Sequence, residues 1–389
     1  MKVVYVLHCT TNASGATKSF HNMLNGLIAN GIEPLVVLPD GDDFCNTLQN
    51  EGIRTLILNY RPATYPPLRN LKEIALFIPK LIARIFVNNV AARKLRKEAE
   101  DFGADLIHTN VSVINIGMKA ARRLGIPHVT HIREYGDKDF NMHVFPSKSA
   151  YFKNFSAEKS YTICITKDIS KYYNLDNQIN SKIVYNGILH TSDVILDLQK
   201  EDYFLFAGRL EESKGITELI EAYGKFCRER KDAFPLLIAG EPVKKNYGNM
   251  LHEMTASLGI TDKVKFLGNR DDVFKLMSKA SALIVPSRSE AFGRVTAEAM
   301  FAGCLVIGKD TAGTKEQFDN GLELTNNEIG LRYSDRAQLI SQMCEVMDNE
   351  TEVYLPMIKR AQEAVVSLYT IEQNTTRIID FYKEIENKN

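Results

Sequence analysis

The chain has 389 residues, of which 44% are hydrophobic, and its 48 basic and 48 acidic side chains leave no formal net charge. This length exceeds one ordinary hydrophobic core and predicts two domains of about 200 residues each. A zero charge balance excludes recognition of a polyanion by overall charge, so we expect no nucleic-acid partner.

The six cysteines are scattered without a Cys-x-x-Cys pair. This usage is typical of reduced thiols and indicates neither a zinc site nor a disulfide framework, so no metal is expected. The first residues, from Met1 to Leu7, form a run too short for a signal peptide and predict a β-strand. Together these features predict a cytoplasmic protein.

Apolar runs typical of strands alternate with helical stretches along the whole chain. The predicted strands are 3–7, 35–38, 54–58, 106–108, 128–132 and 162–165, and then 204–207, 236–239, 264–267, 283–285 and 305–307. This alternation predicts an α/β fold with two Rossmann-like, doubly wound parallel sheets. The predicted domains are 1–186 and 187–369, with a helix over 370–389 that crosses back onto the first domain. Parallel sheets bind ligands at the carboxyl ends of their strands, so we expect the two sheets to face a central cleft.

Residues 68–98 differ from the rest of the first domain, because an apolar run is interrupted by Pro79, Lys80 and Arg84 and the span carries eight basic residues against two acidic ones. An uncharged span of ~18 or more residues is needed to cross a bilayer. Two interpretations remain open. The segment binds an anionic membrane surface peripherally, on the inner face of the cytoplasmic membrane, or it is a helical pair that caps the first sheet.

Polar side chains near the strand ends of the first domain are candidates for ligand contacts. His108 ends the fourth predicted strand, and His131 lies in the fifth, followed by Arg133 and Glu134. Imidazole suits both hydrogen bonding and proton transfer near neutral pH, although a hydrogen-bonded core histidine is the alternative for either one. In the loop after the first strand, peptide N–H groups around Gly15 are a weaker candidate for contact with a phosphate.

The segment from Gly208 to Gly215 predicts a strand-to-helix turn that carries Arg209 and Lys214. A guanidinium and an ammonium group at such a turn can meet a diphosphate and offset the charge of a diphosphate leaving group without a metal. The alternative is an exposed turn in which Arg209 pairs with Glu211 or Glu212. After a later strand, Asn269 and Arg270 could offer backbone groups to a base.

The segment from Ser289 to Met300 carries two carboxylates separated by seven residues. The preceding apolar run stops at Pro286, as a buried parallel strand does, and a helix is predicted from Gly293 or Arg294 to about Gly303. The peptide groups of Phe292, Gly293, Arg294 and Val295 surround the start of this helix, where N–H groups favour an anion. Glu290 in the loop can accept hydrogen bonds from sugar hydroxyls on one side of that anion, and Glu298 from a ribose diol on the other. For an isolated pair, ordinary solvated carboxylates are the alternative.

These motifs, in this order and with Glu290 and Glu298 spaced as E-x7-E, resemble the retaining glycosyltransferases of family 4, also called glycosyl transferases group 1, which have the GT-B fold. The resemblance covers nearly the whole second domain. It implies that Glu290 contacts the donor sugar, Glu298 contacts the ribose, and Arg209 and Lys214 bind the diphosphate of a UDP- or GDP-linked sugar, with no other cofactor.

The first domain matches that family more loosely. Members often carry His-Asp after the fifth strand, where this chain has Arg133-Glu134 with His131 two residues earlier. We therefore take His131, with Arg209, Lys214 and Glu290, as the predicted catalytic set. His108, Arg133 and Glu134 remain candidates on the acceptor side.

The resemblance implies metal-independent transfer of a hexose, with retention, to a glycan or lipid-linked acceptor. Such enzymes commonly build bacterial surface polysaccharides, namely capsule, O-antigen or exopolysaccharide, and a lipid-linked acceptor fits the basic apolar segment 68–98. Two alternatives remain. One is a GT-B epimerase or inverting transferase, and the other is a nucleotide-sugar-binding partner subunit without turnover.

Overall fold

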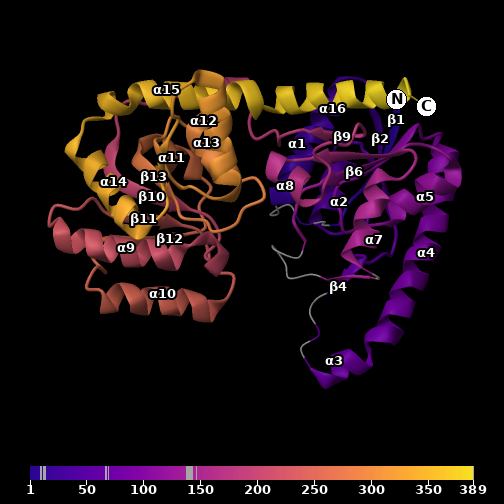
Figure 1. Cartoon of the computed structure of the whole chain (residues 1–389), viewed down its shortest axis with the longest axis horizontal. Coiled ribbons are helices and arrows are strands. Elements are labelled where there is room, and N and C mark those ends of the chain that lie inside the picture. Colours follow the sequence, from indigo (N-terminus) through magenta and orange to yellow (C-terminus); the bar gives the residue numbers. More distant parts are fainter. Residues whose placement is uncertain are drawn as a thin grey trace. The chain divides into compact units, whose positions relative to one another are not determined.

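The computed structural model describes residues 1–8, 11, 15–65, 68, 70–136, 143–145 and 147–388, and Figure 1 shows the course of the chain. The chain divides into two compact units, which we call unit 1 (Met1–Gly187 with Ile371–Asn389) and unit 2 (Ile188–Thr370). Each unit contains a parallel sheet with helices on its faces. The predicted α/β fold with two parallel sheets is therefore confirmed.

The strands described in unit 1 form a seven-stranded sheet of order β3-β2-β1-β5-β6-β8-β9, in which every neighbouring pair is parallel. The strands are β1 (Lys2–Val6), β2 (Glu33–Leu38), β3 (Arg54–Ile57), β5 (Leu106–Thr109), β6 (His128–Ile132), β8 (Ser160–Cys164) and β9 (Ser181–Ile183). A separate antiparallel pair consists of β4 (Thr64–Tyr65) and β7 (His143–Val144). The helices are α1 (Gly15–Ala29), α2 (Asp43–Asn50), α3 (Leu71–Ala75), α4 (Phe77–Phe102), α5 (Ile116–Leu124), α7 (Lys148–Lys153), α8 (Lys167–Tyr172) and α16 (Ile371–Glu386).

Alternate residues of β1 face opposite sides of this sheet, so two cores form. Val3 and Tyr5 pack with apolar residues of α1, α2 and α16, whereas Val4 and Val6 pack with those of α4 and α5. Helix α16 supplies Ile378 and Phe381 to the first of these cores. The last helix of the chain is therefore part of unit 1, and it lies along α1 in Figure 1.

Unit 2 has a six-stranded sheet of order β12-β11-β10-β13-β14-β15, and all of its neighbouring pairs are parallel. The strands are β10 (Glu201–Ala207), β11 (Leu236–Ala239), β12 (Val264–Gly268), β13 (Ala280–Val285), β14 (Val306–Lys309) and β15 (Leu331–Tyr333). The helices are α9 (Ile216–Glu229), α10 (Lys245–Ser257), α11 (Val273–Lys279), α12 (Arg294–Phe301), α13 (Ala312–Thr325), α14 (Arg336–Asp348) and α15 (Thr351–Leu368). Strand β13 lies between β10 and β14, so the turns that follow β10 and β13 end at the same edge of the sheet.

Helices α3 and α4 behave differently over their length. The second half of α4 packs against α5 and buries Ala91, Ala92 and Leu95, whereas the first turns of α4, together with α3, extend away from the sheet strands in Figure 1. Several large apolar side chains on α3 and the first half of α4 are exposed, namely Leu71, Ile74, Ile78, Ile82, Ile85 and Phe86. Within the described ranges, no helix is both long enough and apolar enough to cross a membrane.

Candidate active site

Glu290 lies in the loop between β13 and α12. Pro286 has no N–H to donate to a neighbouring strand, so sheet pairing stops there. The loop then runs to Gly293, which adopts the left-handed conformation (φ 81°) and directly precedes α12. The predicted strand-loop-helix is confirmed, with the last helical residue at Phe301.

Lys214 and Glu290, which are 76 residues apart in the sequence, form an ion pair in which Nζ lies 2.9 Å from Oε1. Both side chains are largely buried, with 22% and 11% of their surface exposed. The same oxygen of Glu290 also accepts a hydrogen bond of 2.7 Å from Ser287 Oγ. Two side chains thus orient this carboxylate.

Two backbone contacts bring the β10–α9 turn to the Glu290 loop. Gly215 has φ 69°, and a Cβ atom on it would lie 2.0 Å from the carbonyl oxygen of Pro286. The N–H of Arg288 donates to the carbonyl oxygen of Ser213 at 3.0 Å. Only glycine allows this approach, which is why Lys214 reaches Glu290.

Arg209 and Glu298 are each paired with a residue near in sequence. Arg209 lies 3.0 Å from Glu211 and is 69% exposed, as expected from the alternative of an exposed turn. Glu298, one turn into α12, lies 3.1 Å from Arg294. The structure therefore joins Lys214 to Glu290 directly. Among the described residues, Arg209 and Glu298 form ion pairs only with residues near them in the sequence.

Three other predicted donor contacts have different surroundings from those expected. The side chain of Phe292 is buried against Tyr369, so its predicted contact with a ligand stays a prediction for its peptide group alone. Arg270 is paired with Asp272 at 2.7 Å. The N–H of Asn269 donates to Glu241 Oε1 at 3.2 Å, so that peptide group is engaged in this conformation. Val295 is partly exposed in the first turn of α12.

The two histidines predicted in unit 1 are fully buried. His108 Nδ1 shares a hydrogen bond with the hydroxyl of Tyr382 on α16, and His131 Nδ1 lies 3.3 Å from the guanidinium of Arg133. Burial, and then the charge of Arg133, hold the pKa of each imidazole well below its ordinary value. A neutral side chain without exposed surface cannot touch a sugar in this conformation, so the burial argues against the predicted roles of His131 as catalytic and His108 as an acceptor-side contact.

Arg133 is more accessible than either histidine. Its guanidinium donates to Asn110 Oδ1 at 2.9 Å and also to Asn186 Oδ1, at the ends of β5 and β9. Glu134 is buried and accepts hydrogen bonds from Ser112 and from the N–H of Arg133. Gly15 is exposed at the first residue of α1, and most of the loop before it lies outside the described residues.

Sequence reasoning assigned no role to Ser287, although its spacing of three residues from Glu290 was a usable signal. It also missed Gln317, whose side chain on α13 bonds to the carbonyl oxygens of Phe292 and Gly293. No local pattern indicates Gln317, since its partners are 24 and 25 residues away.

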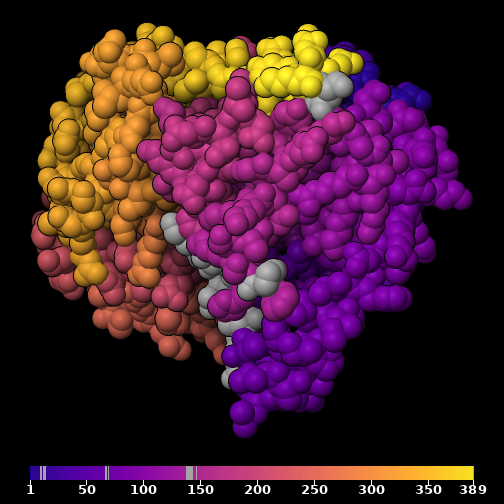
Figure 2. Space-filling model, turned by 45° about the vertical axis from the view of Figure 1, so that its right-hand side comes forward, coloured from indigo at the N-terminus to yellow at the C-terminus, as the bar shows by residue number. Residues whose placement is uncertain are grey.

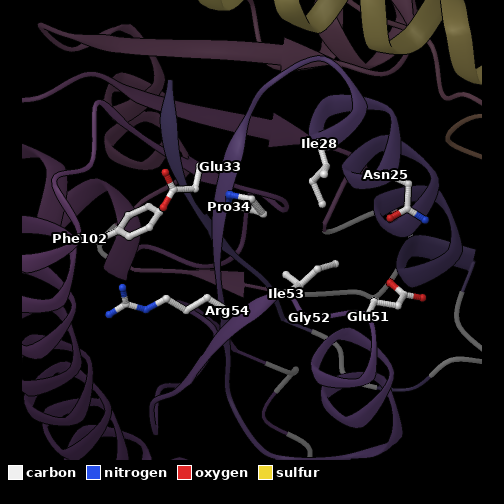
Figure 3. A pocket seen from close by; sticks show the side chains of 9 residues that line it. All are labelled: Asn25, Ile28, Glu33, Pro34, Glu51, Gly52, Ile53, Arg54 and Phe102. Atoms are coloured by element: carbon white, nitrogen blue, oxygen red, sulfur yellow. The ribbon is translucent and has the colours of Figure 1, made fainter.

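A surface depression of about 550 Å³ lies in unit 1, at the edge of the sheet where its strands begin. Figure 3 shows Phe102, Glu33 and Arg54 on one side of it and Ile28 and Asn25 on the other. Its lining comes from the amino ends of β2 and β3, whereas parallel sheets bind ligands at the carboxyl ends of their strands. Over the described part of the chain, no group of three or more His, Cys, Asp or Glu side chains is arranged to hold a metal ion.

Comparison with known families identifies the class of protein. Residues 192–364 match the model for glycosyl transferases group 1, and residues 13–190 match that for glycosyltransferase family 4. The chain therefore belongs to the family 4, or group 1, glycosyltransferases, and it is an enzyme of that class.

Named relatives and solved structures agree with this family. The O-antigen chain mannosyltransferase RfbU of Salmonella typhimurium is 33% identical over 187 residues, which are 47% of this chain and 50% of that protein. An α-1,4-N-acetyl-D-galactosaminyltransferase of Campylobacter jejuni, which acts on an undecaprenol-linked glycan, is 24% identical over 81% of each chain. The structure of Anabaena Alr3699/HepE in complex with UDP has a TM-score of 0.78 at 18% identity and covers 99% of this chain and all of its own. The likeness to that structure supports the GT-B fold.

Proposed function

We propose that this glycosyltransferase moves a hexose, with retention, from a UDP- or GDP-linked sugar to a glycan or lipid-linked acceptor in the synthesis of a bacterial surface polysaccharide such as a capsule, O-antigen or exopolysaccharide. The observation that carries the donor half is the contact of Lys214 with Glu290 beside the amino end of α12. The acceptor class is supported by the activities for which the Salmonella and Campylobacter relatives are named.

In the proposed reaction, the bond between the anomeric carbon and the diphosphate oxygen breaks while the acceptor hydroxyl attacks the same face. The acceptor proton passes to the departing diphosphate. Lys214 and Arg209 stabilise the negative charge that develops on that group without a metal, and the N–H groups at the start of α12 add their partial charges. Glu290 then accepts hydrogen bonds from the sugar, and Glu298 from the ribose.

Donor binding requires that existing pairs be exchanged. Lys214 is paired with Glu290 and Arg209 with Glu211, at 2.9 and 3.0 Å. A diphosphate carries more negative charge than one carboxylate, so both cations gain by moving to it. The carboxylate of Glu290, still oriented by Ser287, is thereby released toward the sugar hydroxyls.

A thermal-shift screen against UDP- and GDP-sugars identifies the donor, because a ligand that binds the folded state raises the melting temperature. Transfer is then measured with that donor and lipid-linked acceptors, with and without a chelator, and the anomeric configuration of the product is read by NMR. We expect transfer with retention in both conditions. Inversion, epimerisation of the donor sugar, or donor binding without transfer to a broad acceptor panel would each favour one of the alternatives.

The exposed face of α3 and the first half of α4 supports a further part of the proposal, binding to an anionic membrane surface. Leu71 is 85% exposed, Ile82 62% and Phe86 68%, and Ile78, Ile82 and Phe86 follow one another every four residues on one side of α4. In Figure 2 the part of unit 1 that contains α3 protrudes from the rest of that unit. Apolar side chains that enter the headgroup region and flanking cations that meet anionic lipids are the two contributions that bind such helices to membranes.

The basic side chains of this segment differ in whether they are available to anionic lipids. Lys72 and Lys80 are exposed on the same segment. Arg84 is not available in the same way, because its guanidinium donates to the carbonyl oxygens of Pro62 and Thr64 and stacks on the ring of Tyr65. Membrane binding through this face would bring the enzyme to a lipid-linked acceptor.

A further inference from the structure

Helix α13 holds the backbone of the Glu290 loop from behind. The N–H of Gly313 donates to the carbonyl oxygen of Glu290 at 2.9 Å. The side-chain amide of Gln317, one turn further along α13, donates through Nε2 to the carbonyl oxygens of Phe292 and Gly293, the latter at 2.9 Å. Consecutive peptide groups of the loop are thus bound to one buried side chain.

The buried amide of Gln317 uses only its donor side. Its side chain is 1% exposed, and its Oε1 is buried without a hydrogen-bond partner among the described residues. Both neighbouring loop groups are acceptors, so turning the amide over would take this donor from both carbonyl oxygens, of which only that of Gly293 keeps another, the N–H of Thr296 at 3.1 Å. An apolar side chain of the same size would likewise remove the donor from both oxygens.

The geometry of the peptide bond links these contacts to the proposed donor site. A trans peptide is planar, so its N–H points opposite to its C=O. The carbonyl of Phe292 shares a peptide plane with the N–H of Gly293, and the carbonyl of Gly293 shares one with the N–H of Arg294. When Gln317 binds both carbonyl oxygens, these two N–H groups point away from α13, at the amino end of α12.

We propose that Gln317 is a positioning residue that aims the N–H groups of Gly293 and Arg294 at the diphosphate of the donor. This inference rests on the proposed function, because it assumes that the anion binds at the start of α12. Gln317 does not touch the donor. It holds the peptide plane that follows Phe292, and it shares with the N–H of Thr296 the plane that follows Gly293, so that less conformational freedom of the loop is lost when the diphosphate arrives.

The test compares Gln317→Met with Gln362→Met. Methionine keeps the length of the side chain and removes its donors. Gln362 is a matched control, since it is also buried in unit 2 and its Nε2 donates to two carbonyl oxygens, those of Ile195 and Phe301. UDP and GDP are titrated into the wild type by calorimetry, and the nucleotide that binds is used for both variants.

We expect Gln317→Met to weaken nucleotide binding about 10-fold and to raise the KM for the donor by a similar factor, with the KM for the acceptor unchanged. Gln362→Met should bind the nucleotide as the wild type does, even if both variants lose the same amount of thermal stability. Gln317→Glu, which places an acceptor against two carbonyl oxygens, should weaken binding at least as much and serves as the second variant if Gln317→Met does not fold.

The other outcomes overturn either the inference about Gln317 or the proposed function. If the wild type binds a nucleotide and folded Gln317→Met binds it equally well, only the inference about Gln317 is overturned. If neither UDP nor GDP binds the wild type, the proposed function fails and the inference fails with it. If both variants at position 317 fail to fold while Gln362→Met folds, Gln317 serves the stability of unit 2 and the positioning role is overturned.

Discussion

One oxygen of the Glu290 carboxylate is paired with an ammonium group and accepts a hydrogen bond from a hydroxyl group. Lys214 comes from the β10–α9 turn, and Ser287 lies in the same loop as Glu290. Lys214 therefore acts as the counter-ion of this carboxylate. The pair is mostly shielded from solvent, so its attraction is screened less than that of a surface ion pair.

Removing either member of this pair should reduce transfer strongly. We expect Lys214→Ala and Glu290→Gln each to lower kcat with the confirmed donor by about 100-fold or more, the usual loss when a group that stabilises developing charge is removed. Steady-state kinetics with purified variants measure this. Lys315→Ala, which removes an exposed lysine paired with Asp319 in the same unit, is the control and should change kcat by less than about twofold. Unchanged rates in Lys214→Ala and Glu290→Gln would refute the proposed site.

Gly215 should tolerate no side chain, because it combines a left-handed backbone with a close approach to Pro286. A Cβ atom there would lie 2.0 Å from a carbonyl oxygen, whereas one on Gly259, with nearly the same φ of 68°, would meet nothing within 4 Å. We expect Gly259→Ala to lower the free energy of unfolding by about 1 kcal/mol through backbone strain alone. Gly215→Ala should lower it by about 3 kcal/mol or more. Urea denaturation measures both, and equal losses would show that the close approach has no energetic weight.

At the scale of elements, α4 has two halves with different surroundings. Its second half buries small and apolar residues against α5, and its first half exposes isoleucines and a phenylalanine. A helix that only capped the sheet would bury an apolar stripe along its whole length. The exposed half is therefore the element best suited to meet a membrane.

Substitution in the exposed half of α4 tests the membrane proposal. Ile82→Asp should weaken binding to vesicles of phosphatidylcholine and phosphatidylglycerol about 10-fold, because a large apolar side chain contributes about 1.5 to 3 kcal/mol when it leaves water. Lys80→Glu should weaken binding mainly at low salt. Co-sedimentation measures the bound fraction.

The control for this experiment is Ile179→Asp. Ile179 is also in unit 1 and is 85% exposed, but it lies outside α3 and α4. Its substitution should leave vesicle binding unchanged. Equal sedimentation of Ile82→Asp and wild type, or equal losses in both aspartate variants, would contradict a membrane contact through α4.

At the scale of the whole molecule, the two units differ in their buried histidines. In unit 1, His108, His128 and His131 are buried, and burial is the first cause that lowers the pKa of each, to about 3 for His128. In unit 2, His190 and His252 are exposed. The two units should therefore respond differently to acid.

Unit 1 should lose stability as the pH falls through about 6.5. The unfolded chain binds protons on these histidines below that pH, whereas the folded unit binds them only at much lower pH. The free energy of unfolding is therefore highest above about pH 6.5 and decreases below it, because protonation favours the unfolded chain. At pH 5.5 the loss is about 1 kcal/mol for each buried histidine. Calorimetry at pH 7.5 and 5.5 should show the transition of unit 1 moving down by several degrees while that of unit 2 moves less. A larger shift in unit 2 would contradict this account.

Much of the fold follows from sequence pattern. Apolar runs such as those of β1 and β13 identify interior strands, most of whose residues are buried. The edge strands β9 and β15 were not predicted, since Ser181-Lys182-Ile183 and Leu331-Arg332-Tyr333 mix polar and apolar residues. The pair β4–β7 was missed for a similar reason, as two-residue strands carry no periodicity.

For the site, the sequence by itself determined which residue types follow which strands. The spacing of Glu290 and Glu298 and the cations at 209 and 214 predicted a place for a diphosphate sugar, because parallel strands bring such turns to one edge. The sequence also determined the family, through motifs that depend on local spacing.

The packing of the folded chain sets which of these side chains meet. It joined Lys214 to Glu290, left Arg209 with Glu211, buried His108 and His131, and placed Gln317 of α13 behind the start of α12. Such contacts depend on the packing of elements far apart in the chain, on rotamers and on burial. The pattern of residues along one strand or helix does not indicate these long-range contacts. The residue types at each turn could therefore be predicted from the sequence, but the partners of each side chain could not.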